Sequence, residues 1–220
     1  GAGSDEIYSG YDKYWRVLAN DSDETVRAAF LNRVPEGAKE TFFTKEFQEK
    51  VRPTDTFAYL TSHAHNANYR GHDLLRFLDL EFFLKGDILA KVDHMSMANS
   101  IEARGPFLDY RIVEFGLTVP SAFLVSKERN KVLVKHLLER SFPPTFVNRP
   151  KVGFMLPVAE WLRAHVDTIV GMEPPAWLRG IIDHAQVRHY AKAYQAGESE
   201  WGNLLFAYLV LCLWAEEHGI

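Results

Sequence analysis

The first six residues, GAGSDE, carry groups that could hold a phosphate and a metal ion. Gly1 and Gly3 stand one residue apart, so backbone amides can approach a ligand closely, and a helix that follows directs its positive end at the same place. Pyrophosphate suits such a loop. Asp5 then offers a hard carboxylate to a magnesium ion that bridges phosphates. The same residues also fit a chain end followed by a helix cap, so both interpretations stay open here.

Two further stretches contain charged residues whose sequence neighbours restrict either their backbone conformation or their exposure to water. Lys151 lies in Asn148-Arg149-Pro150-Lys151-Val152-Gly153-Phe154, where the proline stiffens the approach and the glycine permits a tight turn. A lysine held in this way acts as a point charge on a phosphate or a developing oxyanion, although a solvated loop lysine has the same pattern.

The second charged stretch is residues 87–109. Its charged residues stand beside strongly apolar neighbours, and buried charges are normally paired. We expect Glu102 and Arg104 to be substantially buried and paired in a network that fixes a turn. Direct binding of substrate by some of these side chains is the alternative.

Helical periodicity dominates the elements that must position these groups, with Pro and Gly as helix stops. We expect a mainly α fold and one compact helical unit over residues 1–220. Residues 73–85 are apolar on so many sides that their helix should be buried, and residues 117–125 are the one stretch with strand character. The predicted helices cover about 5–15, 24–33, 44–50, 53–65, 73–85, 87–100, 111–117, 130–140, 157–165, 184–196 and 200–217.

Composition narrows the class of protein. The 220 residues include 25 Lys plus Arg and 29 Asp plus Glu, a net charge of −4, which lacks the basic excess of nucleic-acid-binding domains. No apolar run reaches the ~18 residues that a membrane helix needs. Cys212, the single cysteine, lies in an apolar run and is expected to be a buried, inert thiol, which fits a reducing, cytoplasmic setting. Residue 1 is Gly rather than Met, so we expect further sequence upstream.

The order and spacing of three motifs resemble the asparagine synthetase family. The runs GAGSDEIYSGYDKY, LAKVDHMSMANSIEARGPFLD and NRPKVGFMLPVAEWL follow one another in the family's order. They are similar to its Gly-x-Gly-[Ser/Ala]-Asp-Glu loop, its Ser-x-Glu-x-Arg-x-Pro-Phe-Leu-Asp segment and its Arg-Pro-Lys-x-Gly-Phe loop. The ending from Trp201 to Trp214 looks like the family's last helix, so the resemblance covers nearly the whole chain.

The resemblance implies a fold and a reaction. The chain would be the C-terminal helical part of an α/β adenine-nucleotide α-hydrolase-like (PP-loop) synthetase domain whose sheet lies mostly upstream. ATP and Mg²⁺ would activate a carboxylate, typically that of aspartate, as an acyl-adenylate, and ammonia from glutamine would attack it to give asparagine. Gly1, Gly3 and Ser4 would line the pyrophosphate site, and Asp5 would bind there and ligate magnesium. Lys151 would be catalytic, stabilising charge on the α-phosphate and on the leaving pyrophosphate.

The same resemblance implies missing parts and partners. The family's ATP-gripping Ser-Gly-Gly-x-Asp-Ser loop and its N-terminal glutaminase domain with a cysteine nucleophile are absent from these residues, so we expect the isolated chain to be inactive. The expected partners are the small-molecule substrates aspartate, ATP and ammonia from glutamine, with no nucleic acid and no membrane. Assembly of the protein as a homodimer is a further possibility.

Ala2 is the main departure from the family pattern, because an acidic residue is usual between the two loop glycines. In asparagine formation that carboxylate is thought to assist the attack of the amine, and a methyl group cannot accept a proton. His94 and Gly105 are minor departures. Two alternatives therefore remain: a specialised relative that joins the adenylate to another amine, as in a lactam or macrolactam, and a non-catalytic helical interaction domain.

Overall fold

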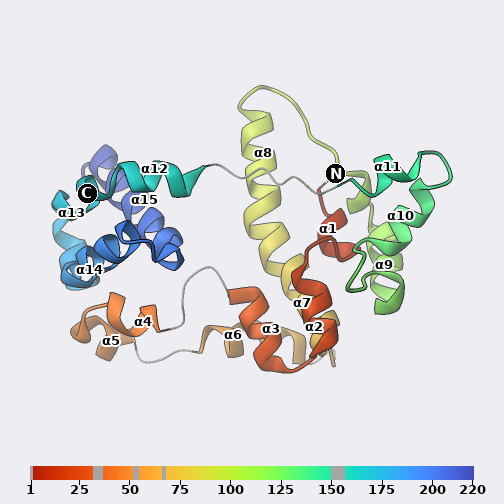
Figure 1. The fold of residues 1–220 in the computed structure, drawn as a ribbon, viewed down its shortest axis with the longest axis horizontal. Helices are drawn as coiled ribbons and strands as arrows, with labels where there is room; N and C mark the ends of the chain where they lie inside the picture. The colour runs from red at the N-terminus through yellow and green to blue at the C-terminus, as the bar shows by residue number, and fades with distance from the viewer. Residues whose placement is uncertain (1, 32–36, 52–54, 66–67, 150–156) are drawn as a thin grey trace. The chain divides into compact units, whose positions relative to one another are not determined.

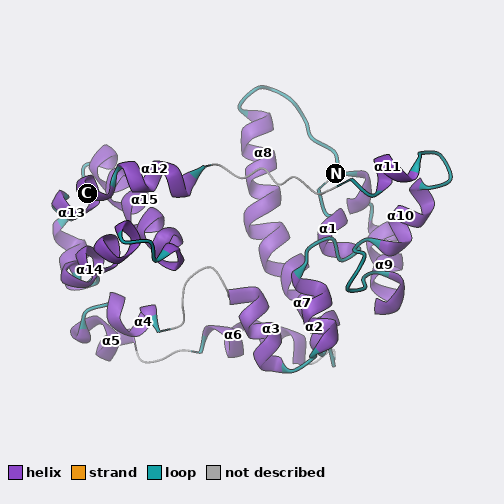
Figure 2. Cartoon of the chain, viewed as in Figure 1, coloured by secondary structure: helices purple, strands orange, loops and turns teal. Residues whose placement is uncertain are grey.

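Helices form almost all of the regular structure, as the spacing of apolar residues predicts. A computed structural model describes residues 2–31, 37–51, 55–65, 68–149 and 157–220. Within these ranges the chain consists of helices and loops without a strand (Figure 2). One isolated antiparallel bridge joins Phe43 to Ile182. The expectation of a mainly helical chain is confirmed.

The chain divides into two compact units with separate cores. Unit 1 comprises Gly1–Leu31 and Thr56–Lys151, and unit 2 comprises Asn32–Asp55 and Val152–Ile220. That residues 1–220 form one helical unit stays a prediction.

Unit 1 carries most of the helices (Figure 1). They are α1 (Ser4–Ile7), α2 (Lys13–Ala19), α3 (Asp23–Leu31), α6 (Thr56–His65), α7 (Gly71–Leu78), η1 (Asp79–Leu89), α8 (Ala90–Met97), η2 (Pro106–Leu108), α9 (Tyr110–Thr118), η3 (Ser121–Phe123), α10 (Val132–Leu138) and α11 (Pro144–Val147).

Unit 2 is built from shorter helices and the long C-terminal one. They are α4 (Ala38–Phe42), α5 (Lys45–Val51), α12 (Val158–Ala164), α13 (Val166–Gly171), η4 (Ala176–Gly180), α14 (His184–Gln195), η5 (Ser199–Trp201) and α15 (Gly202–His218).

Helix α7 is the centre of the unit 1 core. It packs against α2, α3 and α6, and its residues Leu74, Leu75 and Leu78 are at most 3% exposed. A second, smaller cluster joins α1 to the region around α9 through Ile7, Tyr8 and neighbouring apolar side chains. This second cluster holds the start of the chain in place.

The helix that begins with α7 continues without a break through η1 and α8. Two separate helices, 73–85 and 87–100, were expected because Gly86 lies between them, but η1 is π-helical and carries the helix through this glycine. The expected burial holds only in part. Leu84 is buried, whereas Phe82 and Phe83 are partly exposed.

Strand formation at residues 117–125 does not occur. Helix α9 extends to Thr118 and the 3-10 turn η3 follows, with Leu124 N donating to Ser121 O at 2.9 Å. Pro120 lacks an N–H group and supports a turn here rather than a paired strand.

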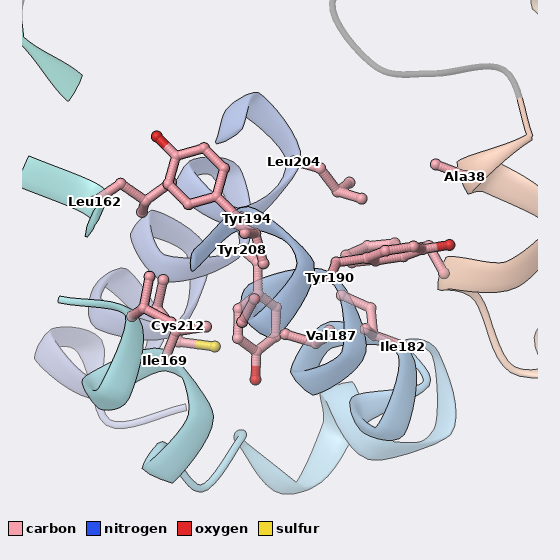
Figure 3. Packing of buried hydrophobic residues seen from close by; sticks show 14 of the residues in the cluster. Ala38, Leu162, Ile169, Ile182, Val187, Tyr190, Tyr194, Leu204, Tyr208 and Cys212 are labelled. Carbon is pink, nitrogen blue, oxygen red and sulfur yellow. The ribbon is translucent and has the colours of Figure 1, made fainter. Parts of the chain in front are cut away.

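Helices α14 and α15 contribute many of the buried side chains in the core of unit 2. Figure 3 shows buried side chains of this core, among them Tyr190, Tyr194, Tyr208 and Cys212. Tyr190 stacks on Trp201 with ring centroids 4.0 Å apart. Cys212 is a free thiol and 4% exposed, which confirms the expected burial, and this burial raises the pKa of the thiol. Across the described ranges, no helix is both long and apolar enough to cross a membrane.

The expected burial of Glu102 and Arg104 is wrong. Their side chains are 69% and 82% exposed, and they form an ion pair with each other at 2.7 Å. Residues 101–104 lie outside any helix and are exposed. An exposed pair of this kind contributes little to stability.

Arg76 is a buried charge that connects elements of unit 1. Its side chain is 1% exposed, and Nη2 donates to the backbone carbonyls of Ile7 and Gly116, each at 2.7 Å. A further contact of 3.4 Å reaches Asp73. One guanidinium therefore joins the ends of α1 and α9 to α7.

Replacing Arg76 with Met should lower the free energy of unfolding by about 3 kcal/mol, because buried carbonyls lose their donor. Arg104→Met is the matched control and should change it by less than about 0.5 kcal/mol. Urea denaturation of the two variants measures both values. Equal midpoints for the two variants would contradict the assigned role of Arg76.

Candidate functional site

The loop at the start of the chain depends on the small size of Gly3. This residue has φ 86°, in the left-handed region, and directly precedes helix α1. A Cβ atom here would lie 2.3 Å from Leu108 Cδ2, inside the segment that resembles the family's Pro-Phe-Leu-Asp sequence. The first and middle motifs of the sequence therefore pack directly on each other, and any larger residue at position 3 would separate them.

Ser4 and Asp5 meet a lysine that lies far away in the sequence. Lys131 Nζ donates to Ser4 Oγ at 2.8 Å and lies 3.1 Å from Asp5 Oδ1. The side chains of Lys131 and Asp5 are 21% and 22% exposed, so the pair is largely shielded from water. Sequence reasoning missed Lys131, because a single lysine before a helix carries no local signal.

Gly10 leaves the space that this contact needs. Its N–H donates to Asp5 O at 2.8 Å, which folds the chain back after α1. A Cβ atom on Gly10 would lie 2.0 Å from Asp5 Oδ1 and 2.3 Å from Lys131 Cε. Only glycine lets both side chains occupy this volume.

The turn that carries Lys131 is anchored on the same loop. Asn130 Nδ2 donates to Gly10 O at 3.1 Å, and Lys135 Nζ donates to Asn130 Oδ1 at 2.9 Å. The pKa of Lys135 is lowered, first by burial and then by the positive charges of Arg129 and Lys131. Positive charge is therefore concentrated beside the Ser4–Asp5 loop.

The two adjacent acids of the loop face different environments. Glu6 is 1% exposed and accepts a hydrogen bond from Tyr11 Oη at 2.6 Å. Burial raises the pKa of Glu6. Asp5 instead lies partly exposed against Lys131. Of the two carboxylates, Asp5 is the one that a ligand can reach.

Ser9, His72 and Asp73 have the residue types of a hydrolase triad, and their geometry needs separate attention. Ser9 Oγ lies 2.9 Å from His72 Nε2, and His72 Nδ1 lies 3.4 Å from Asp73 Oδ1. Ser9 is 0% exposed and His72 5%, so no substrate can reach the hydroxyl. The contact between Ser9 and His72 stabilises the turn after α1, where Ser9 has φ 54°.

The remaining predicted site residues are Gly1 and Lys151. Both lie outside the described residues, as does the whole stretch 150–156. Asp109 caps α9, with Arg111 N donating to its Oδ1 at 3.0 Å, and hydrogen bonds from Arg111 lower the pKa of Asp109 to about 2. Gly3 directly precedes α1, and Ser4 and Asp5 are the first two residues of this helix, where both contact Lys131.

Comparisons with known proteins agree on one family. The sequence model of asparagine synthase matches residues 1–216. A putative glutamine-hydrolyzing asparagine synthetase of Mycobacterium tuberculosis is 29% identical over 174 residues, which are 77% of this chain and 27% of that protein. Glutamine-hydrolyzing asparagine synthetase 1 of Bacillus subtilis is 25% identical over 222 residues, covering 86% of this chain and 34% of that protein.

The chain therefore spans between about a quarter and a third of the length of these relatives. No solved structure matches it. The family model, however, extends from the glycine loop through most of the last helix, and it includes all three motifs in order. On this evidence, the chain belongs to the asparagine synthase family.

Proposed function

We propose that the protein carrying this chain is an ATP-dependent synthetase that converts a carboxylate to an amide. The observation that carries the proposal is the family match over residues 1–216. The names of the relatives point to aspartate as the carboxylate and to glutamine as the source of ammonia, with asparagine as the product. The proposed chemistry would be carried by residues Gly3 to Asp5 and by Lys151.

The proposed reaction has two steps. An aspartate carboxylate oxygen attacks the α-phosphorus of ATP, and pyrophosphate leaves. Ammonia then attacks the acyl carbon, loses a proton, and AMP leaves with the carboxylate oxygen. Gly1, Gly3 and Ser4 would line the pyrophosphate, while Lys151 would stabilise charge on the α-phosphate and the leaving group.

Asp5 fits the role of a magnesium ligand in this reaction. Its carboxylate is partly exposed, and within the described ranges no three His, Cys, Asp or Glu side chains gather into a metal site. A single protein carboxylate suits Mg²⁺, which usually takes one or two carboxylates together with substrate phosphates. Bound there, the metal would neutralise phosphate charge.

The proposal extends to the complete protein. Residues 1–220 would be the helical C-terminal portion of a PP-loop-type synthetase domain, with the sheet and the ATP-gripping loop contributed by other residues of the protein. A glutaminase domain would supply ammonia, the enzyme would be cytoplasmic, and residues 1–220 alone would be inactive. Homodimer formation belongs to the same proposal.

Ala2 favours a second candidate function. A methyl group here cannot act as a base for the attacking amine, whereas the adenylation residues are retained. A relative that joins the adenylate to another amine, as in a lactam or macrolactam, would place its base elsewhere. Loss of catalysis altogether, leaving a helical interaction domain, is the remaining alternative.

Lys151→Ala in the complete protein should abolish aspartate-dependent exchange of pyrophosphate into ATP, because a preorganised positive charge at the transition state is lost. Glutaminase activity should stay within about twofold of wild type. Radiolabelled pyrophosphate exchange and glutamate release measure the two activities separately. Exchange at the wild-type rate in Lys151→Ala would refute the assignment.

Ala2→Glu tests which amine the enzyme uses. General-base assistance contributes about 10²–10⁴-fold, so in the wild-type protein pyrophosphate should appear faster than asparagine. The substitution should bring the two rates together if asparagine is the product. Rates that stay apart, with no asparagine formed by either protein, would favour the second candidate function.

A further inference from the structure

Lys131 already occupies the cation position beside Asp5. Its ammonium contacts both Ser4 and Asp5, at 2.8 and 3.1 Å, and these are the two loop residues assigned to pyrophosphate and magnesium. A magnesium ion bound to Asp5 would share this carboxylate with a second positive charge. The two cations repel each other unless a polyanion neutralises both.

Three features show that this contact is built into the fold. Lys131 has φ 51° and ψ 41°, a left-handed conformation that is uncommon for a residue with a Cβ atom. Its stem crosses Gly10 in a space that any Cβ would fill. Asn130 fixes the turn on the carbonyl of Gly10. Strained backbone that persists in a well-anchored turn is typical of functional positions.

We propose that Lys131 is a positioning residue that makes metal binding at Asp5 depend on pyrophosphate. Without the polyanion, the ammonium neutralises Asp5 and disfavours a second cation. With pyrophosphate bound, its negative charges interact with both the metal and Lys131, so the two ligands bind cooperatively. The inference rests on the proposed function of the Gly3–Asp5 loop and adds to it the coupling between the two ligands.

The test measures Mn²⁺ binding to the complete protein by electron paramagnetic resonance, with and without pyrophosphate, at matched free Mn²⁺. The quantity of interest is the ratio of the two Mn²⁺ dissociation constants, which expresses the coupling directly. Wild type should bind Mn²⁺ at least tenfold more tightly when pyrophosphate is present. Lys131→Met should reduce this ratio about tenfold, because Mn²⁺ alone binds more tightly and pyrophosphate adds less.

Three further variants separate coupling from folding. Lys131→Gln keeps a donor for Ser4 without the charge, so it should behave like Lys131→Met and serves if the latter does not fold. Lys131→Arg keeps the charge and should retain the ratio within about threefold. Lys127→Gln removes an exposed lysine from the same loop and should match wild type. A purely structural role would weaken Mn²⁺ binding in both conditions and leave the ratio unchanged, which would overturn the proposal.

Two outcomes distinguish this inference from the function on which it rests. If pyrophosphate has no effect on Mn²⁺ binding to the wild type, the assignment of Gly3 to Asp5 as a pyrophosphate site is wrong. The proposed role of Lys131 is then overturned as well. If wild type shows the effect and the uncharged Lys131 variants show it equally, only the role of Lys131 is overturned.

Discussion

The buried guanidinium of Arg76 is the interaction on which the geometry of unit 1 depends. It lies within α7, the helix against which α2, α3 and α6 pack, and it donates to the carbonyls of Ile7 and Gly116. These carbonyls belong to α1, which directly follows Gly3, and to α9. Because the two backbone carbonyls accept hydrogen bonds from one buried Nη2 atom, this arrangement fixes α1 relative to the core. The position of Asp5, which lies in α1, depends on these hydrogen bonds.

The geometry of the site itself depends on two glycines whose backbone lies close to the side chains of other residues. Gly3 and Gly10 each face a volume that another side chain fills, that of Leu108 at the first and those of Asp5 and Lys131 at the second. Asp5 and Glu6 are adjacent, yet the fold sends one toward Lys131 and the other into the core. The division between a reachable and a buried carboxylate follows from the direction of α1, which Arg76 fixes.

Sequence patterns predicted well those features of the fold that depend on neighbouring residues in the chain. Helices α5 and α9 form close to the predicted ranges 44–50 and 111–117, and Thr44 Oγ1 and Asp109 cap them by accepting from Phe47 N at 3.2 Å and from Arg111 N. The continuous helix through Gly86 could not be predicted, because glycine has a low helix propensity. Burial of Glu102 and Arg104 was inferred from apolar neighbours in sequence, and these do not enclose them in space. Lys131 reaches Ser4 only through tertiary structure, so no spacing rule could identify it.

The most direct test of the account follows the oxygen atoms of the acyl substrate. The complete protein would be supplied with ATP, glutamine and aspartate labelled with ¹⁸O in its side-chain carboxylate, and the AMP analysed by mass spectrometry. Adenylation transfers one carboxylate oxygen to phosphorus, so the account predicts one ¹⁸O atom in each AMP formed together with asparagine. Asparagine accompanied by unlabelled AMP, or by ADP in place of AMP, would contradict it.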